Sequence, residues 1–176
     1  MTKSVRWPPS ELVRLERSLD ELAESVREQP ENRSDQEQVW LVKFLIVRSC
    51  GYLEQVMHLC ATGHLREKSY GTARSYSLSW LSRSINPSAE NILSTLGRFD
   101  AGFADEFREM LEKDNGSLAN DLGALITKRH AIAHGENEGL GARRALDLYE
   151  MAKQVADWMI LRLHPDPSWG SSFPRS

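Results

Sequence analysis

An arginine and two histidines fall close together near the C-terminal end of the chain, at Arg129, His130 and His134. Gly135 follows at once, at the point where an apolar helical pattern ends. Arginine offers a phosphate group a planar fork of hydrogen-bond donors, and histidine exchanges protons near neutral pH. Residues of these types in this order favour phosphodiester chemistry without a metal, with Arg129 on the phosphate and His134 moving the proton.

The spacing limits how these side chains can meet. Successive residues of a helix turn by about 100°, so Arg129 and His134 lie about 140° apart around the axis. A regular helix therefore cannot aim both at one phosphate. Either the helix ends or bends at Ala133 and His134, as Gly135 permits, or two chains share the site across a two-fold axis. His130 and His134 are four positions apart and share a face.

Other readings of the same residues stay open. A histidine in the last turn lies at the negative end of the helix dipole, which stabilises its protonated form and suits a general acid. The same position also suits a histidine that merely caps helix carbonyls. His130 and His134 have the spacing of zinc ligands, but Ala131 stands where a His-Glu-x-x-His motif has its glutamate. We therefore expect no metal, and no cofactor-binding motif is present.

The rest of the chain predicts helices that position this segment. The spacing of apolar residues predicts seven helices. Their approximate ranges are 10–30, 35–59, 70–81, 87–99, 102–113, 117–134 and 142–163. Ser34 and Glu37 form a capping-box pattern before the second, and residues 63–71 are expected to break the chain. Because no segment alternates with a period of two, we predict an all-α bundle.

The composition of the chain limits the classes of protein to which it can belong. The chain has 176 residues and a net charge of −3, which argues against non-specific coating of nucleic acid but allows a small basic cleft. No apolar run approaches a membrane span and the N-terminus lacks a signal-peptide core, so we expect a cytoplasmic protein. Cys50 and Cys60 lie about 15 Å apart on one helix, too far to bridge, and are expected to be buried thiols.

Aromatic residues at helical spacing are expected to belong to the core rather than to a base-stacking surface. This set is Trp40, Phe44, Phe103, Phe107 and Trp158. The environment of Tyr52 and Tyr149 is left open.

Three stretches together resemble one family. Residues 129–135 are similar to the Arg-x-x-Ile-x-His-Gly form of the RiboL-PSP-HEPN branch of the HEPN superfamily. Residues 44–54 resemble its Arg-x-x-Gly-Tyr-x-Glu helix, in which Arg48 and Glu54 stand at the charged positions. Residues 86–100 resemble its following Asn-Pro segment. The resemblance spans about residues 34–163, and it is the order of the motifs that makes it specific.

The resemblance implies a HEPN-like helical bundle with additional short helices and a domain over residues 34–164. Residues 1–33 would form an N-terminal helix packed on the bundle, and residues 165–176 a flexible tail. It further implies a homodimeric, metal-independent endoribonuclease that leaves 2′,3′-cyclic phosphate and 5′-hydroxyl ends. His134 would be the general acid or base and Arg129 the phosphate ligand, with His130 assisting.

Further residues and partners follow from the same resemblance. Arg48, Lys128 and Arg143 are expected to contact RNA, and Arg48 with Glu54 to form an ion pair or to line the site. Members commonly act as toxins or in antiviral defence, which implies an antitoxin or a defence-system partner. Glu136 stands where some HEPN toxins carry a modified tyrosine, so regulation by that route is not expected. The alternative is a non-catalytic HEPN module that binds RNA or a nucleotide, or serves in assembly.

Overall fold

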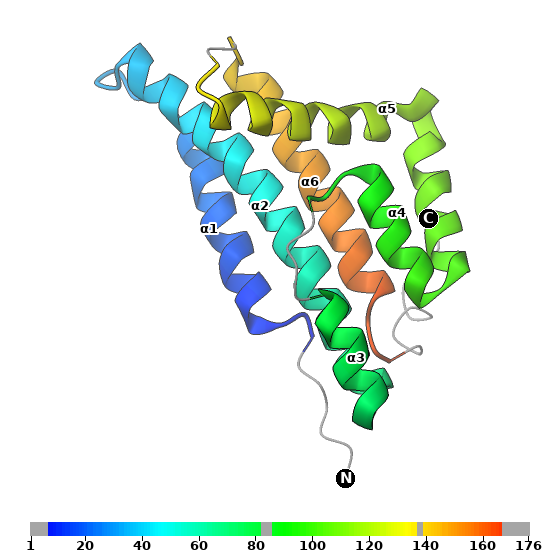
Figure 1. The fold of residues 1–176 in the computed structure, drawn as a ribbon. Coiled ribbons are helices and arrows are strands. Elements are labelled where there is room, and N and C mark those ends of the chain that lie inside the picture. Colours follow the sequence, from blue (N-terminus) through cyan, green and yellow to red (C-terminus); the bar gives the residue numbers. More distant parts are fainter. Residues whose placement is uncertain (1–6, 82–85, 137–138, 167–176) are drawn as a thin grey trace.

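The chain folds into six α-helices, with no strand in residues 7–81, 86–136 and 139–166, which are those that the computed structural model describes (Figure 1). The helices are α1 (Ser10–Arg27), α2 (Asp35–Lys68), α3 (Gly71–Leu81), α4 (Ala89–Phe99), α5 (Ala101–Ala133) and α6 (Ala142–Arg162). The predicted all-α bundle is confirmed. None of these helices is both long and apolar enough to cross a bilayer.

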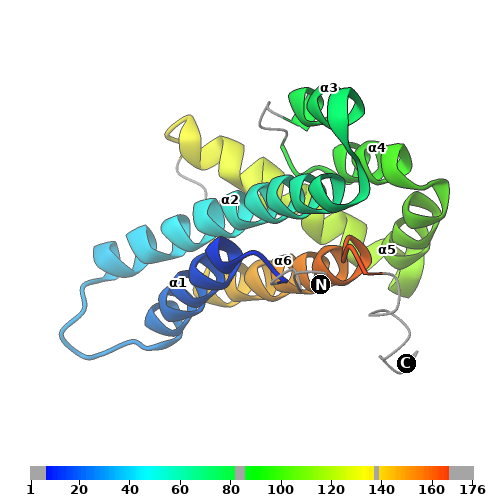
Figure 2. The ribbon, with the colours of Figure 1, turned by 90° about the horizontal axis from the view of Figure 1, so that it is seen from below.

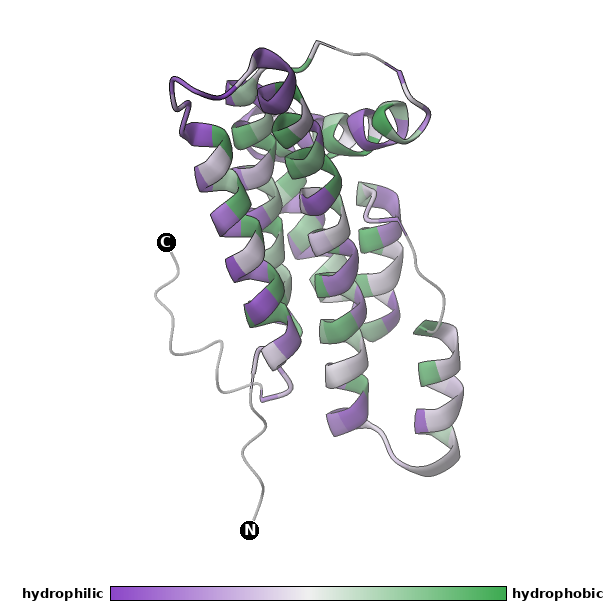
Figure 3. Ribbon diagram, turned by 90° about the vertical axis from the view of Figure 1, so that its left-hand side faces the viewer, coloured by the Kyte–Doolittle hydropathy of each residue, from purple (hydrophilic) through white to green (hydrophobic). Residues whose placement is uncertain are grey.

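The long helices α2 and α6 form the centre of the bundle. The helix α1 packs against both of them, α5 packs on their other side, and α4 packs against α5 (Figures 1 and 2). Buried aliphatic residues such as Leu45 and Leu53 of α2 and Leu148 and Val155 of α6 fill the core. Hydrophobic and hydrophilic residues alternate along each helix in Figure 3, as expected for helices with one buried face.

The helix α2 begins where the sequence predicts and ends later. The Ser34 hydroxyl accepts a hydrogen bond from the Glu37 backbone at 3.3 Å, and the Glu37 carboxylate accepts one from the Ser34 backbone at 2.8 Å. The break expected at residues 63–71 is wrong, because the helix continues through Gly63 to Lys68. The Trp7 ring packs so closely that a Cβ at Gly63 would lie 2.9 Å from it. Tertiary packing here outweighs the low helix propensity of glycine.

The helix α5 is bent into two pieces at residues 113–116. Asp114, Asn115 and Gly116 take left-handed conformations, with φ of 51°, 58° and 74°. Aspartate, asparagine and glycine are the residues that tolerate this region best. The predicted interruption between the helices over 102–113 and 117–134 is confirmed. The bend turns the second half of α5 across α6 and brings its C-terminal end towards α2 (Figure 1).

The expected aromatic core is partly wrong. Phe107 is fully buried, and Phe103 and Trp158 pack against the core from partly buried positions. Trp40 and Phe44, however, are 63% and 53% exposed. They lie on the face of α2 that points away from the core, because helical spacing identifies apolar positions but not which of them meet a neighbouring helix.

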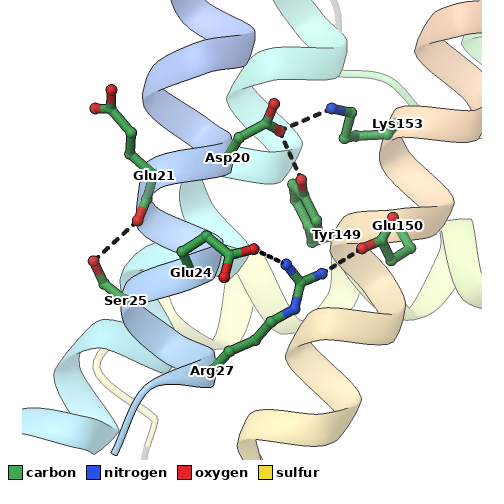
Figure 4. A network of polar contacts seen from close by, with 8 residues as sticks. All are labelled: Asp20, Glu21, Glu24, Ser25, Arg27, Tyr149, Glu150 and Lys153. Carbon is green, nitrogen blue, oxygen red and sulfur yellow. Dashed lines mark hydrogen bonds and ion pairs between the residues drawn. The ribbon is translucent and has the colours of Figure 1, made fainter. Parts of the chain in front are cut away.

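Hydrogen bonds and ion pairs connect α1 to α6 (Figure 4). The Lys153 ammonium lies 2.8 Å from the Asp20 carboxylate and 3.0 Å from that of Glu16. The Tyr149 hydroxyl donates to Asp20 at 2.6 Å. Burial, followed by this hydrogen bond, raises the pKa of Tyr149. Tyr149 and Tyr52 are both buried, which answers the question that the sequence left open.

Candidate functional site

The C-terminal end of α5 is a regular helix end that leaves His134 in its helical direction. His134 has φ of −87° and ψ of 4°, and the left-handed turn comes one residue later, at Gly135 with φ of 77°. The Gly135 N–H donates to the carbonyl of Ile132 at 3.1 Å and the Glu136 N–H to that of Ala131 at 2.9 Å. This is the Schellman pattern. The helix therefore ends at Ala133 with His134 as its C-cap residue, which is one of the two alternatives that the spacing left open.

Arg129 lies against α2. Burial raises the pKa of the Cys50 thiol to about 11; the Glu54 carboxylate adds to this rise, and the positive charge of Arg129 opposes it. Arg129 is half-buried, and within the described residues its guanidinium has no hydrogen bond or ion pair. A half-buried fork of donors without a protein acceptor is well suited to bind an anionic ligand.

The two histidines occupy the other side of the same helix end. His130 and His134 are both exposed, and helical geometry separates them by only about 40°. His134 and Arg129 are separated by about 140° around the axis. One chain therefore brings the two histidines onto one surface and places Arg129 on another.

The expected RNA contacts come from three different helices. Arg48 of α2 and Lys128 of α5 are half-buried, and Arg143 is exposed in the first turn of α6. In the described part of the chain, no ion pair joins Arg48 to Glu54. The expected ion pair is wrong because six helical positions place the two residues on different faces of α2, about 120° apart.

Acidic residues predominate on the face between α5 and α6. A cleft of about 940 Å³ opens there. Its lining includes six carboxylates, those of Glu106, Glu109, Asp114, Asp121, Asp147 and Glu150. Lys113 also lines the cleft, and Glu106, Asp121 and Glu150 form ion pairs with Arg162, Arg144 and Arg27, so its negative charge is partly compensated.

An exposed apolar face on α2 leads towards Arg129. Trp40, Phe44 and Val47 are 63%, 53% and 36% exposed, and a turn of about 100° per residue places them on one side of the helix. Glu54, whose carboxylate acts on the Cys50 thiol as Arg129 also does, continues the same side. We name Trp40, Phe44 and Val47 the α2 apolar face. A hollow of about 720 Å³ lies beside it, lined in part by Trp40 and Phe44.

Sequence reasoning missed this face although its signal was present. Trp40 and Phe44 stand at helical spacing, which predicts burial in the core. A helix that is apolar all round also fits a second, external partner.

Both thiols are buried and neither is bridged, as expected. Burial raises the pKa of Cys60 to about 12. A thiol held protonated in this way is a poor nucleophile, so covalent catalysis by either cysteine finds no support.

Comparison with known proteins gives one match. Residues 10–160 match the family model described as RiboL-PSP-HEPN, which confirms the family expected from the three motifs. The matched range includes α1. No curated protein and no solved structure shows significant similarity to the chain.

Proposed function

Because the chain belongs to the RiboL-PSP-HEPN family, we propose that it is a metal-independent endoribonuclease whose active site is assembled from two copies of the chain. Membership itself indicates a nuclease or another RNA-related function. The observation that carries the finer proposal is the end of α5. There an arginine with no acceptor among the described residues and an exposed histidine stand in the motif order of the family, on different sides of one helix end.

The chemistry follows from the properties of these side chains. A histidine at the helix end takes the proton of the ribose 2′-hydroxyl, and the 2′-oxygen bonds to the adjacent phosphorus. The bond from phosphorus to the 5′-oxygen breaks, and an imidazolium supplies the proton to that leaving oxygen. Arg129 binds the non-bridging oxygens, whose negative charge grows in the transition state. The products carry a 2′,3′-cyclic phosphate and a 5′-hydroxyl.

Two chains resolve the geometric conflict within one chain. A two-fold axis beside the end of α5 would place Arg129 of one copy opposite His134 of the other, together with a second, symmetry-related pair. The α2 apolar face supplies a surface for such an association, since exposed apolar patches commonly mark protein interfaces. His130, on the His134 surface, would assist in proton transfer, and Arg48, Lys128 and Arg143 would hold the flanking RNA.

The decisive test is RNA cleavage in the presence of EDTA. Wild-type protein is expected to cut RNA and leave 2′,3′-cyclic phosphate ends, while His134→Ala and Arg129→Ala lose at least about 100-fold in rate. Arg108→Ala is the matched control for arginine, because Arg108 is exposed and pairs only with Asp105 on its own helix. Circular dichroism must show unchanged helix content. A His134→Ala protein as active as wild type refutes the mechanism.

The wild-type, His134→Ala and Arg129→Ala proteins also test a second candidate function, RNA or nucleotide binding without cleavage. The unengaged Arg129 guanidinium alone suits a module that binds RNA or a nucleotide without cutting it. That function predicts no cleavage by wild type and a weaker RNA affinity for Arg129→Ala. A toxin or antiviral setting, with an antitoxin or defence-system partner, extends the proposal at the level of the family. Growth arrest on expression of wild type but not of His134→Ala would support it.

A further inference from the structure

The helix α3 displays its aromatic residues instead of burying them. None of its residues is buried, and Tyr76 and Trp80 are 66% and 52% exposed. Tyr70, just before the helix, is 76% exposed. Helices in proteins are normally stabilised by burying an apolar face. The large rings of α3 therefore form a surface that internal packing does not explain.

Arginines accompany these rings. The Arg98 guanidinium of α4 lies 4.5 Å from the centre of the Trp80 ring, and that of Arg74 lies 5.1 Å from the centre of the Tyr70 ring. Each guanidinium covers one side of its ring and keeps its charge at the surface. The Tyr76 and Trp80 rings stand beside each other with centres 6.5 Å apart.

Acidic residues are absent from the sequence of α3 and of the turn before it. The chain as a whole has 25 acidic and 22 basic residues, yet no aspartate or glutamate occurs from Lys68 to Leu81. A groove of about 330 Å³ runs between α3, α4 and the end of α2. Its lining is Leu65, Tyr76, Ser77, Trp80, Leu81, Thr95, Arg98 and Phe99, which includes one cation and no anion.

We propose that single-stranded RNA binds across α3 and α4, with bases stacked on Tyr76 and Trp80 and phosphates held by Arg98 and Arg74. Aromatic faces combined with arginines, without carboxylates, complement a strand of exposed bases and negative phosphates. A protein partner that buried these rings would not need a groove whose charged lining residue is the single cation Arg98. The inference rests on RNA being the ligand of this protein, as in the proposed function.

This surface is separate from the Arg129 and His134 helix end. The helix α3 follows the C-terminal end of α2, while Arg129 lies near Cys50 (Figures 1 and 2). The 18 positions from Cys50 to Lys68 correspond to about 27 Å along the helix axis. The α3 surface would therefore hold a strand at a distance from the bond that is cut, and would select long substrates over dinucleotides.

The test measures binding without cleavage. Full-length His134→Ala protein is titrated against a fluorescein-labelled, unstructured 20-nucleotide RNA, and fluorescence anisotropy gives the affinity. Adding Tyr76→Leu and Trp80→Leu together should weaken binding at least about tenfold, because leucine keeps the apolar bulk but loses the stacking face. Tyr76→Phe with Trp80→Phe should retain the affinity. Circular dichroism checks that α3 remains folded in both.

A charge-matched pair tests the arginine. Arg98→Gln should weaken binding, whereas Arg108→Gln, which makes the same change in net charge on an exposed helix face, should not. Equal affinity of the leucine and phenylalanine proteins, or no RNA binding by the His134→Ala protein, overturns the α3 proposal. Cleavage by wild type is scored separately. Binding that depends on the rings without any cleavage would refute the ribonuclease and leave the α3 surface standing.

Discussion

Arg129 lies in the last turns of α5 and His134, five positions later, is its C-cap residue, so helical spacing directs their side chains about 140° apart. Arg129 is half-buried against α2, and His134 is exposed. The two residues are thus close in sequence and held by the same helix end, but they face different surfaces. This divergence is the geometric basis of the proposal that a second chain completes the site.

Mixing inactive proteins should restore activity if the site is composite. A heterodimer of Arg129→Ala and His134→Ala contains one site that lacks both groups and one intact site. Random exchange makes about half of the dimers heterodimers, so an equimolar mixture should recover up to about a quarter of wild-type cleavage. Sites built within one chain would recover nothing. The measurement is cleavage rate against mixing time, with each mutant alone as the blank.

The α2 apolar face should control dimerisation. Phe44→Asp places a charge where two apolar faces would meet, and should convert a dimer into a monomer while abolishing cleavage. Val13→Asp, on the exposed side of α1, is the matched control, since Val13 is 42% exposed and lies on another helix. Sedimentation velocity at micromolar concentration reports the change. A Phe44→Asp protein that stays dimeric places the interface elsewhere.

Acid should destabilise the fold through His64. Its Nδ1–H donates to the carbonyl of Leu163 at 3.0 Å, and its ring meets that of Phe99. Burial lowers the pKa of His64, although the hydrogen bond to Leu163 acts in the opposite direction. The neutral form is favoured on folding, so this stabilisation is present above a pH of about 6.5 and is lost as the pH falls below it.

His64→Gln should reduce that dependence, because glutamine keeps a donor for Leu163 but does not titrate. Thermal unfolding midpoints at pH 7.5 and 5.5 give the comparison. Equal losses of stability in wild type and His64→Gln would show that other groups dominate the acid response.

The contacts between α1 and α6 should differ in their contribution to stability. The Lys153 side chain is 21% exposed and contacts both Asp20 and Glu16, so Lys153→Met should cost about 1 kcal/mol in the free energy of unfolding. The Arg27 side chain, 40% exposed, makes the neighbouring pair with Glu150. Arg27→Met should change stability by less than about 0.5 kcal/mol. Urea unfolding measures both, and the opposite order would contradict the assignment.

The sequence by itself determined the helices, most of their ends and the family. Ser34, Ser88 and Gly135 act on backbone groups within a few residues, so their effects can be read locally. The order of the three motifs identified the RiboL-PSP-HEPN family, which the match over residues 10–160 confirms. Only the tertiary structure decided what lies against each helix.

The tertiary structure extended α2 through Gly63, because Trp7 packs over that glycine. It exposed Trp40 and Phe44, because α1 and α6 pack on the other side of α2. It placed Arg129 beside Cys50 and left His134 in solvent. These outcomes depend on residues far apart in the chain. A helical pattern records which positions are apolar or charged, and only the packed bundle shows which of them face a neighbour.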